Sequence, residues 1–311
     1  MNYELKNLRT ALAEALLELG KKNKNVVALT ADLGESSKSL EFGKKYPDRY
    51  FDVGVAEANM VGIAAGLALE GKIPFVTTYA VFCPGRSLDQ VRQSVCYNQA
   101  NVKICSSHAG LSVGPDGATH QALEDIAIMR TLPNMTVIVP CDYHETKKAV
   151  LAAAKIKGPV YIRYGRTDLP IITETSDKFE IGKASVLKNG NDATIIACGP
   201  MVYQALLAAQ ELEKKGIKVR VINLATIKPI DKNVIIKAAQ ETGKILTIED
   251  HQVAGGMGSA VAEVLAQNYP IKMKIMGMPD SFGQSGQPDE LYNFYGLNSE
   301  SIVKEIIKLI K

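Results

Sequence analysis

The first segment with residues suited to chemistry begins at Glu57, which follows a predicted strand at 50–53. From Glu57 to Leu69 the sequence is almost wholly apolar, and a helix that is apolar on all sides is expected to be buried. A carboxylate buried with it tends to have a raised pKa and to share a proton with a partner, as a proton relay requires. The other interpretation is structural, because an acid in the first turn of a helix also stabilises the helix dipole.

A second segment, residues 106–121, places two of the chain's four histidines close to an aspartate. His108, Asp116 and His120 lie within 13 residues, in a loop with three glycines and a proline. The spacing does not match a helical metal site, and a site for a hard metal would need more carboxylates. Hydrogen-bond donors and acids for a polyhydroxylated substrate fit this composition better. A solvated loop in which the histidines are incidental is the structural alternative.

Several motifs that would identify other chemistries are absent from the sequence. There is no GxxxxGK[ST] phosphate loop and no Gx[ST]xG nucleophile elbow. Residues 255–259 (GGMGS) lack the third glycine and the early position of a dinucleotide fingerprint, so we interpret them as a tight turn that leads into a helix. Cys83 and Cys105 have no histidine at a spacing that suggests a nucleophile pair. Hydrolase chemistry is therefore unsupported.

Length and composition indicate a folded protein of about two domains. The chain has 311 residues, of which 46% are hydrophobic and 22% charged, and an ordinary domain has ~150 residues. The formal net charge of +3 is too small and too evenly spread for a nucleic-acid surface or a polybasic membrane patch. Anionic small molecules remain compatible with this charge.

Cysteine usage and hydropathy favour a cytoplasmic protein. The five cysteines are scattered and form no CxxC pair, which argues against a disulfide framework or a zinc ribbon and for a reducing cytosol. The longest small and apolar run, residues 60–69, has ten residues, well short of the ~20 that span a bilayer. Leucines near the N-terminus recur with helical spacing, so neither a membrane span nor a secretory signal is expected.

Hydrophobic periodicity predicts an α/β fold. From Leu5 to Leu19, leucines recur every three or four residues and predict an amphipathic helix that Gly20 can end. Apolar runs predict strands at 26–29, 50–53, 74–78, 102–107, 136–139 and 160–163, and a second series at 193–198, 218–224, 244–249 and 271–276. Their alternation with helix-compatible stretches is typical of largely parallel sheets covered by helices on both faces.

We therefore expect two doubly wound sheets joined by a polar linker. The first sheet is expected in residues 1–170, the linker in 171–190, and a smaller second sheet in 191–311. Because ligands of open α/β sheets bind at the carboxyl ends of the strands, the residues after each strand are the candidates for a site. The second domain offers no catalytic candidate, Asp250 and His251 included.

Five segments, taken in order, resemble the C-terminal half of transketolase. They are Ala31-Asp32-Leu33, residues 54–60 (GVAEANM), residues 113–121 (VGPDGATHQ), residues 132–135 (LPNM), and Glu249-Asp250-His251 with residues 254–259 (AGGMGS). The resemblance covers essentially the whole chain and implies a pyrimidine-binding domain in 1–170 followed by a transketolase C-terminal domain in 191–311. Transketolases carry a diphosphate-binding domain ahead of these two, with a GDG motif and a downstream Asn for Mg²⁺, and this chain has no GDG.

The resemblance implies that thiamine diphosphate binds between this chain and a diphosphate-binding domain. Glu57 would contact N1′ of the aminopyrimidine, and the shared proton would favour the imino tautomer that removes the thiazolium C2 proton. Tyr79 and Phe82 match aromatic positions around the pyrimidine, and Asp32 resembles an interface aspartate near the cofactor. The family pattern departs after Phe82, at residues 83–86 (CPGR). Core packing for the aromatics and turn capping for Asp32 are the structural alternatives.

The resemblance also implies a sugar-phosphate site. Asp116 and His120 fall where the family holds the hydroxyls of the donor ketose and handles protons, and His108 matches the family's substrate-side histidine. For the sugar phosphate it points to three residues, of which the arginines carry a planar fork of donors: Arg9, Ser36 and Arg166. The alternative for each arginine is a solvated surface charge.

The resemblance therefore implies the C-terminal subunit of a split transketolase, which transfers a two-carbon ketol unit from a ketose phosphate to an aldose phosphate. The chain itself supplies no metal ligand. A separate N-terminal subunit would hold Mg²⁺ and the diphosphate of thiamine diphosphate, in an α2β2 assembly around a homodimeric core. The isolated chain is expected to be inactive.

Three alternatives share most of this layout. Deoxyxylulose-phosphate synthase usually lacks a histidine at the position of His108, and the β subunit of 2-oxo acid dehydrogenases does not need sugar-phosphate arginines. Donor choice separates them, because turnover of pyruvate would count against a transketolase. A non-catalytic interaction subunit of the same fold is expected to have lost the acid at position 57, and Glu57 is present.

Overall fold

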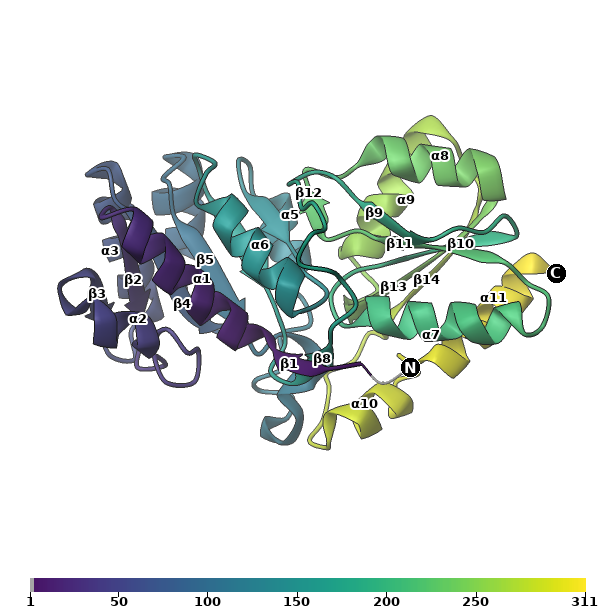
Figure 1. Cartoon of the computed structure of the whole chain (residues 1–311), viewed down its shortest axis with the longest axis horizontal. Coiled ribbons are helices and arrows are strands. Elements are labelled where there is room, and N and C mark those ends of the chain that lie inside the picture. The colour runs from purple at the N-terminus through teal and green to yellow at the C-terminus, as the bar shows by residue number, and fades with distance from the viewer. Residues whose placement is uncertain (1–2) are drawn as a thin grey trace.

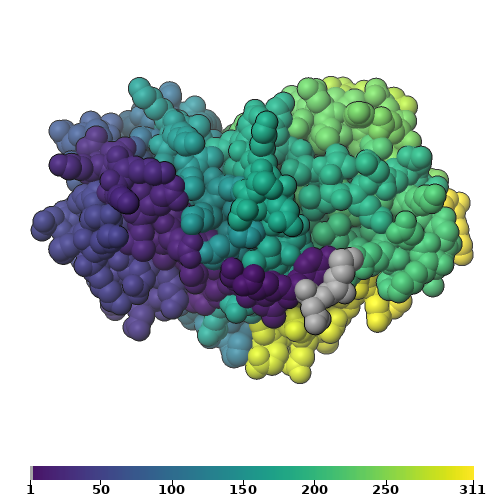
Figure 2. Space-filling model, viewed as in Figure 1, coloured from purple at the N-terminus to yellow at the C-terminus, as the bar shows by residue number. Residues whose placement is uncertain are grey.

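The structure is a computed structural model, which describes residues 3–311 as two α/β lobes side by side (Figure 1). Apart from one edge strand of the first sheet, the chain completes the first lobe before it builds the second, as the expected α/β fold with two sheets requires. The space-filling view in Figure 2 shows the N-terminal segment lying across the junction, where the ring of Tyr3 meets the ring of Tyr203 edge to face at 5.5 Å. Across the described residues, no helix has both the length and the apolar character needed to cross a bilayer.

The first sheet has seven strands in the order β12-β6-β7-β5-β4-β2-β3. They are β2 (Val26–Thr30), β3 (Tyr50–Asp52), β4 (Ile73–Tyr79), β5 (Lys103–Ser107), β6 (Thr136–Ile138), β7 (Val160–Arg163) and β12 (Thr226–Lys228). Every pairing among β2 to β7 is parallel, and β2, β5 and β7 are buried at every residue. The six strands predicted for this half of the chain are thus confirmed, because a parallel strand covered on both faces leaves an apolar run in the sequence.

Helices cover both faces of this sheet. They are α1 (Leu8–Lys22), α2 (Leu40–Lys45), η1 (Pro47–Arg49), α3 (Glu57–Leu69), α4 (Leu88–Gln90), η2 (Val91–Tyr97), η3 (Gly110–Asp116), α5 (Asp125–Thr131) and α6 (Tyr143–Ala153). The leucines of α1 pack with α2 and α6 in one apolar cluster, whereas α3, η2 and α5 pack in another. The sheet is therefore doubly wound.

The first predicted helix begins later than the leucine spacing suggested. Leu5 belongs to β1 (Leu5–Asn7), which pairs antiparallel with β8 (Asp168–Pro170), and its side chain is 61% exposed. Asn7 caps α1 by accepting a hydrogen bond from the backbone N–H of Arg9 at 3.0 Å, which fixes the helix start at Leu8. The helix continues to Lys22, and a Cβ at Gly20 would lie 2.6 Å from the rings of Phe42 and Tyr46. This glycine therefore permits close packing instead of ending the helix.

The second sheet has five strands in the order β14-β13-β10-β11-β9. Its strands are β9 (Ser185–Lys188), β10 (Ala193–Ala197), β11 (Val219–Asn223), β13 (Lys244–Gln252) and β14 (Lys272–Met278), and its helices are α7 (Met201–Glu213), α8 (Lys232–Thr242), α9 (Met257–Asn268), α10 (Pro288–Phe294) and α11 (Ser299–Ile310). The four predicted strands are confirmed. The range predicted as a linker, 171–190, contains β9, which pairs antiparallel with β11.

The two lobes share a core. β12 comes from the second half of the chain but pairs antiparallel with β6 at the edge of the first sheet. One apolar cluster runs without interruption from Val27 in β2 to Val264 in α9. Beneath this junction, Arg163 at the end of β7 pairs with Asp125 of α5, with Nε 2.9 Å from Oδ2 and both side chains no more than 2% exposed. Residues far apart in sequence are thus fixed relative to one another.

Replacement of Asp125 by alanine is expected to destabilise the chain by about 3–5 kcal/mol, because it leaves the Arg163 guanidinium buried without its partner. The control is Glu14→Ala, since Glu14 pairs with Lys147 at 2.9 Å on the surface, where such a pair contributes about 0–1 kcal/mol. Denaturation by urea measures both. Equal losses for the two variants would contradict the prediction.

Candidate functional site

The predicted site residues lie at the carboxyl-end side of the first sheet, where ligands of α/β sheets bind. Tyr79 is the last residue of β4, His108 follows β5 directly, and Arg166 lies three residues after β7. Glu57 is the first residue of α3, after the turn that leaves β3. Short connections from neighbouring strands therefore bring these side chains to one edge of the sheet.

Glu57 is buried at the N-terminus of α3, as the sequence predicts. Its side chain is 4% exposed, and Oε1 accepts a hydrogen bond from Nη1 of Arg86 at 3.1 Å. The helix it opens is buried on one side only, contrary to the expectation of burial all round, because Ile63 is 38% exposed and Leu69 is 65% exposed. A Cβ added at Gly62 would meet no atom within 4 Å.

A row of rings extends from Glu57 across the site. Tyr79 stacks on His108, with ring centroids 3.7 Å apart, and on Phe82, with centroids 5.6 Å apart. Phe82 meets His120 edge to face at 5.6 Å, and the guanidinium of Arg86 lies 4.0 Å from the Phe82 ring centroid. Five predicted residues, Glu57, Tyr79, Phe82, His108 and His120, are thus connected through side-chain contacts.

His108 lies in a strained and dehydrated position. Its φ is +55°, it is 2% exposed, and its Nδ1 lies 2.9 Å from the hydroxyl of Ser107. Burial lowers the pKa of His108 to about 3, with smaller contributions from the charges of Arg9, Arg166 and His120. The imidazole is therefore neutral near pH 7 and can take part in hydrogen bonds without carrying charge.

Asp116 and His120 lie on the rim of the site, in the 110–121 loop. Asp116 is half-exposed, and its Oδ1 lies 3.3 Å from Nη1 of Arg166, which also donates to the carbonyl of Val113 at 2.8 Å. Nδ1 of His120 lies 2.9 Å from the hydroxyl of Thr119. Both predicted residues therefore belong to one segment that Arg166 ties to the first lobe.

The three residues predicted to bind a phosphate lie near one another. Nη1 of Arg9 donates to the carbonyl of Ser36 at 3.0 Å, and Nε donates to Oδ1 of Asn7 at 2.9 Å. Asn7 in turn donates to the carbonyl of Arg166 at 3.1 Å. Burial is the largest cause of the lowered pKa of Arg9. The two arginines thus converge on the β1–β8 ribbon, but Ser36 contacts Arg9 through its backbone instead of its hydroxyl.

Asp32 is set apart from the other predicted residues. It lies two residues after β2, exposed and with φ of +59°, and its backbone N–H donates to Oδ1 of Asp52 at 2.9 Å. In the part of the chain that the structure describes, no hydrogen bond, ion pair or ring contact joins its side chain to the row of rings.

Arg86 is a site residue that the sequence did not assign. In the sequence, Arg86 was noted only as one of the four residues, 83–86, that depart from the family pattern after Phe82. In the structure its backbone N–H donates to the carbonyl of Phe82 at 2.8 Å, so a helical turn places the two side chains on one face. This spacing of four residues was the available signal, whereas the ion pair with Glu57 spans 29 positions and has no local signature.

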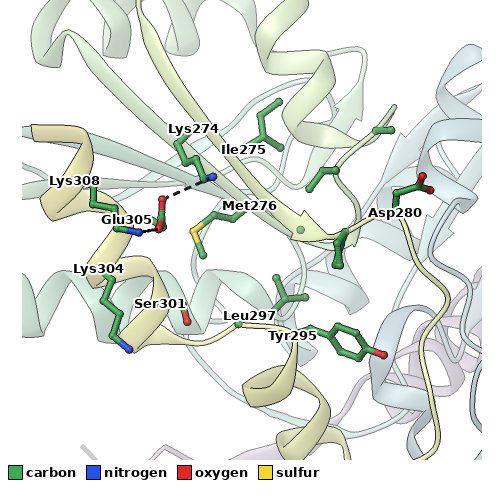
Figure 3. A pocket seen from close by; sticks show the side chains of 15 residues that line it. Lys274, Ile275, Met276, Asp280, Tyr295, Leu297, Ser301, Lys304, Glu305 and Lys308 are labelled. Atoms are coloured by element: carbon green, nitrogen blue, oxygen red, sulfur yellow. Dashed lines mark hydrogen bonds and ion pairs between the residues drawn. The ribbon is translucent and has the colours of Figure 1, made fainter.

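A cavity of about 840 Å³ lies elsewhere, between β14 and α11 of the second lobe (Figure 3). Glu305 lies among its three lysines, 2.6 Å from Nζ of Lys308 and 3.8 Å from Nζ of Lys274, and so offsets part of their charge. The lining residues all fall between 253 and 308, whereas every predicted site residue precedes 167. Within residues 3–311, no group of three or more histidine, cysteine, aspartate or glutamate side chains is arranged to hold a metal ion.

Two family models match the chain. "Transketolase, pyrimidine binding domain" matches residues 5–171, and "Transketolase, C-terminal domain" matches residues 182–302. The chain belongs to the transketolase family. These matches agree with the resemblance inferred from the sequence motifs.

Similar proteins of the same length support this assignment. A Methanocaldococcus jannaschii protein that carries the name of a transketolase C-terminal section is 48% identical, over 98% of this chain and 97% of its own length. One subunit of an apulose-4-phosphate transketolase from Phocaeicola vulgatus is 42% identical, over 97% of each chain. A solved structure described as a split gene transketolase, inactive beta4 tetramer, has a TM-score of 0.92 and 47% identity over 97% of this chain and 98% of its own.

The low pKa of His108 predicts that this histidine stays neutral from pH 5 to 9, whereas an exposed imidazole titrates near ~6.5. Because its folded pKa lies below the unfolded value, the stability His108 contributes is complete above about pH 6.5 and is lost as the pH falls toward 3. Long-range ¹⁵N–¹H spectra of histidine-labelled chain measure the titration, with His108→Gln to assign the signal. A midpoint for His108 near that of a free imidazole would contradict the assignment.

Proposed function

We propose that the chain is the pyrimidine-binding and C-terminal subunit of a two-chain transketolase, which transfers a two-carbon ketol unit from a ketose phosphate to an aldose phosphate. The observation that carries the proposal is the buried carboxylate of Glu57 at the start of α3, next to the stacked rings of Tyr79 and Phe82. Membership of the transketolase family supports thiamine diphosphate as the cofactor.

The residues of the site fit the aminopyrimidine end of that cofactor. Two aromatic side chains, stacked 15° from parallel, offer apolar faces to a planar ring, and Glu57 offers a dehydrated acceptor beside them. When bound, thiamine diphosphate supplies an electron sink for the bond-breaking step. Glu57 would hold the proton at N1′ of the pyrimidine, and Arg86 fixes the orientation of the carboxylate. The diphosphate and Mg²⁺ are assigned to a partner chain.

The neighbouring polar side chains suit a sugar. A neutral His108 can donate or accept a hydrogen bond with a hydroxyl at any pH from 5 to 9, and burial keeps water away from it. His120 and Asp116 lie on the rim, where they can contact the hydroxyls of a ketose and transfer protons. The substrate in the name of the Phocaeicola vulgatus relative, apulose 4-phosphate, belongs to the same class of sugar phosphates.

Arg9 and Arg166 suit the phosphate of such a substrate. Guanidinium groups bind phosphate through paired N–H donors. The Arg9 side chain and the Arg166 backbone carbonyl both contact Asn7, and the charge of Arg166 contributes to the lowered pKa of Arg9. Each arginine retains N–H donors beyond those used in the hydrogen bonds described above. Ser36 would contribute through the same short loop that Arg9 holds.

The outer face of α3 supports the expectation that this subunit works in an assembly. Ile63 and Leu69 of the helix are 38% and 65% exposed, Val55 just before it is 69% exposed, and a Cβ at Gly62 or Gly66 would meet nothing within 4 Å. An apolar helix face with a glycine stripe allows another backbone to approach closely. A second copy of this chain is the occupant expected for a homodimeric core, with N-terminal subunits completing an α2β2 assembly. The similar solved structure, a tetramer of β chains described as inactive, is consistent with this requirement for a partner.

The isolated chain is expected to show no turnover of xylulose 5-phosphate with ribose 5-phosphate, and activity should require a diphosphate-binding subunit. In that complex, Glu57→Gln should lower kcat about 10²–10⁴-fold, because the amide cannot hold the N1′ proton. Glu14→Gln, on the surface of α1, is the matched control and should retain activity. Full activity of Glu57→Gln, or turnover of pyruvate in place of the ketose, would contradict the proposal.

Loss of the Arg9 guanidinium is expected to weaken binding of phosphorylated substrates only. Arg9→Met should raise the KM for a ketose phosphate about 10- to 150-fold, corresponding to about 1.5–3 kcal/mol for a charged hydrogen bond, with kcat little changed. Steady-state kinetics with phosphorylated and unphosphorylated ketoses measure the difference. An equal effect on both sugars would assign Arg9 a structural role instead. Lys147→Met, on the exposed face of α6, is the control.

A further inference from the structure

The 110–121 loop, which carries Asp116 and His120, lies between the first lobe and two segments of the second lobe. One segment is the end of β13, at Asp250, and the other is the turn of residues 283–288 that leads into α10. The function proposed above gives the second lobe no role at the site. Its contacts with the loop nevertheless involve both ends of the part that bears the two rim residues.

Asp250 binds the start of the loop. Its side chain is 2% exposed, Oδ1 accepts a hydrogen bond from the backbone N–H of Leu111 at 3.0 Å, and Oδ2 accepts one from the hydroxyl of Tyr292 at 2.9 Å. Gly110 has φ of +70°, and a Cβ there would lie 1.9 Å from Oδ2. The absence of a side chain at Gly110 therefore lets the carboxylate reach the loop backbone directly.

The 283–288 turn holds the far end of the loop. Nε2 of Gln121 donates to the carbonyl of Gln284 at 3.0 Å. A Cβ at Gly283 would lie 1.9 Å from Oε1 of Gln121, and a Cβ at Gly117 would lie 2.6 Å from the hydroxyl of Ser285. The loop and the turn thus pack at the closest distance that glycine allows.

The glycines of the 110–121 loop would leave its backbone flexible without the contacts to Asp250 and the 283–288 turn. Gly114 and Gly117 have φ of +72° and +74°, so the backbone turns sharply on both sides of Asp116. From the first lobe, Arg166 holds the middle of the loop through Val113 and Asp116, and this arginine is half-exposed. The hydroxyl of Ser112 also accepts a part-buried hydrogen bond from the backbone N–H of Arg166 at 2.9 Å, whereas the buried hydrogen bond to the loop backbone comes from Asp250.

We propose that the second lobe positions the 110–121 loop for the sugar, with Asp250 as the positioning residue at its start and the backbone of the 283–288 turn at its end. The proposal rests on the proposed function for the identity of the substrate. Asp250 acts through Leu111 and touches no reacting atom. The second lobe therefore helps to position Asp116 and His120.

Hydrogen–deuterium exchange of the full chain tests the positioning without any activity. Asp250→Ala should speed exchange of amides in 110–121 at least tenfold while β2 and β4 exchange as in the wild type. Asp250→Asn should restore slow exchange, because its Oδ1 still accepts from Leu111 and its amide can donate to the Tyr292 hydroxyl oxygen. Gly283→Ala, which displaces Gln121 by a separate route, should also loosen the loop and serves if Asp250→Ala fails to fold.

Ile302→Ala is the matched control, since Ile302 of α11 is buried in the apolar cluster of the second lobe that also includes Leu111, but makes no hydrogen bond to the loop. It should lower the denaturation midpoint without selectively speeding exchange in 110–121. Slow exchange of the loop in Asp250→Ala, or faster exchange spread equally over the second lobe in Asp250→Ala and Ile302→Ala, would overturn the proposal.

Kinetics of the complex with a diphosphate-binding subunit test the link to the sugar. Asp250→Ala should raise the KM for the donor ketose about tenfold, with the Kd of thiamine diphosphate within twofold of wild type and Asp250→Asn near wild type. A loosened loop with an unchanged ketose KM would overturn the proposal. If the wild-type complex turns over no ketose phosphate, the proposed function itself fails, and exchange alone then decides whether Asp250 positions the loop.

Discussion

The buried guanidinium of Arg163 is the constraint around which the two lobes are organised. A charge removed from water must be fully paired, and Arg163 meets this need with the carboxylate of Asp125 at 2.9 Å and the backbone carbonyl of Asp250 at 2.5 Å. Tyr161 donates to the same Asp125 carboxylate at 2.7 Å. Because α5, β7 and β13 each supply one partner, none of them can shift without leaving a buried polar group unpaired. Because the side chain of Asp250 also accepts a hydrogen bond from Leu111, this arrangement is connected to the loop that carries Asp116 and His120.

The sequence predicted every central strand but missed two of the four strands at the edges of the two large sheets, β9 and β12, for a physical reason. A parallel strand covered on both faces is largely apolar, so β4 and β10 can be recognised in the sequence as short apolar runs. By contrast, β9 and β12 lie at sheet edges, are four and three residues long, and owe their pairing to distant parts of the chain. The start of α1 was misplaced similarly, since the leucine spacing continues through Leu5, whereas the cap at Asn7 and pairing with β8 decide the boundary.

The residues of the candidate site also differ in how far the sequence could predict them. Glu57 at the start of α3 and His108 after β5 could be proposed from their position and type, whereas Tyr79 was proposed from the family resemblance. Arg86 could not, because its contact with Glu57 depends on how the turn after β4 folds, and the family pattern is lost there. Asp250 was also passed over, since its contact with Leu111 joins residues 139 positions apart. Long-range pairing of polar groups leaves little trace in local sequence.

The exposed apolar face of α3 has no function in the isolated chain. In isolation, a helix with exposed Ile63, Leu69 and two glycines gains nothing from its outer face, and a mixed polar face would serve solubility better. The proposed second chain explains this exposed apolar face. A site that includes Glu57 at the start of α3 needs a neighbouring surface on which the second chain can pack. The burial expected from the sequence would then be completed in the assembly. On this view, the inner face of the helix that begins at Glu57 packs in the core of the chain, and its outer face packs against the second chain.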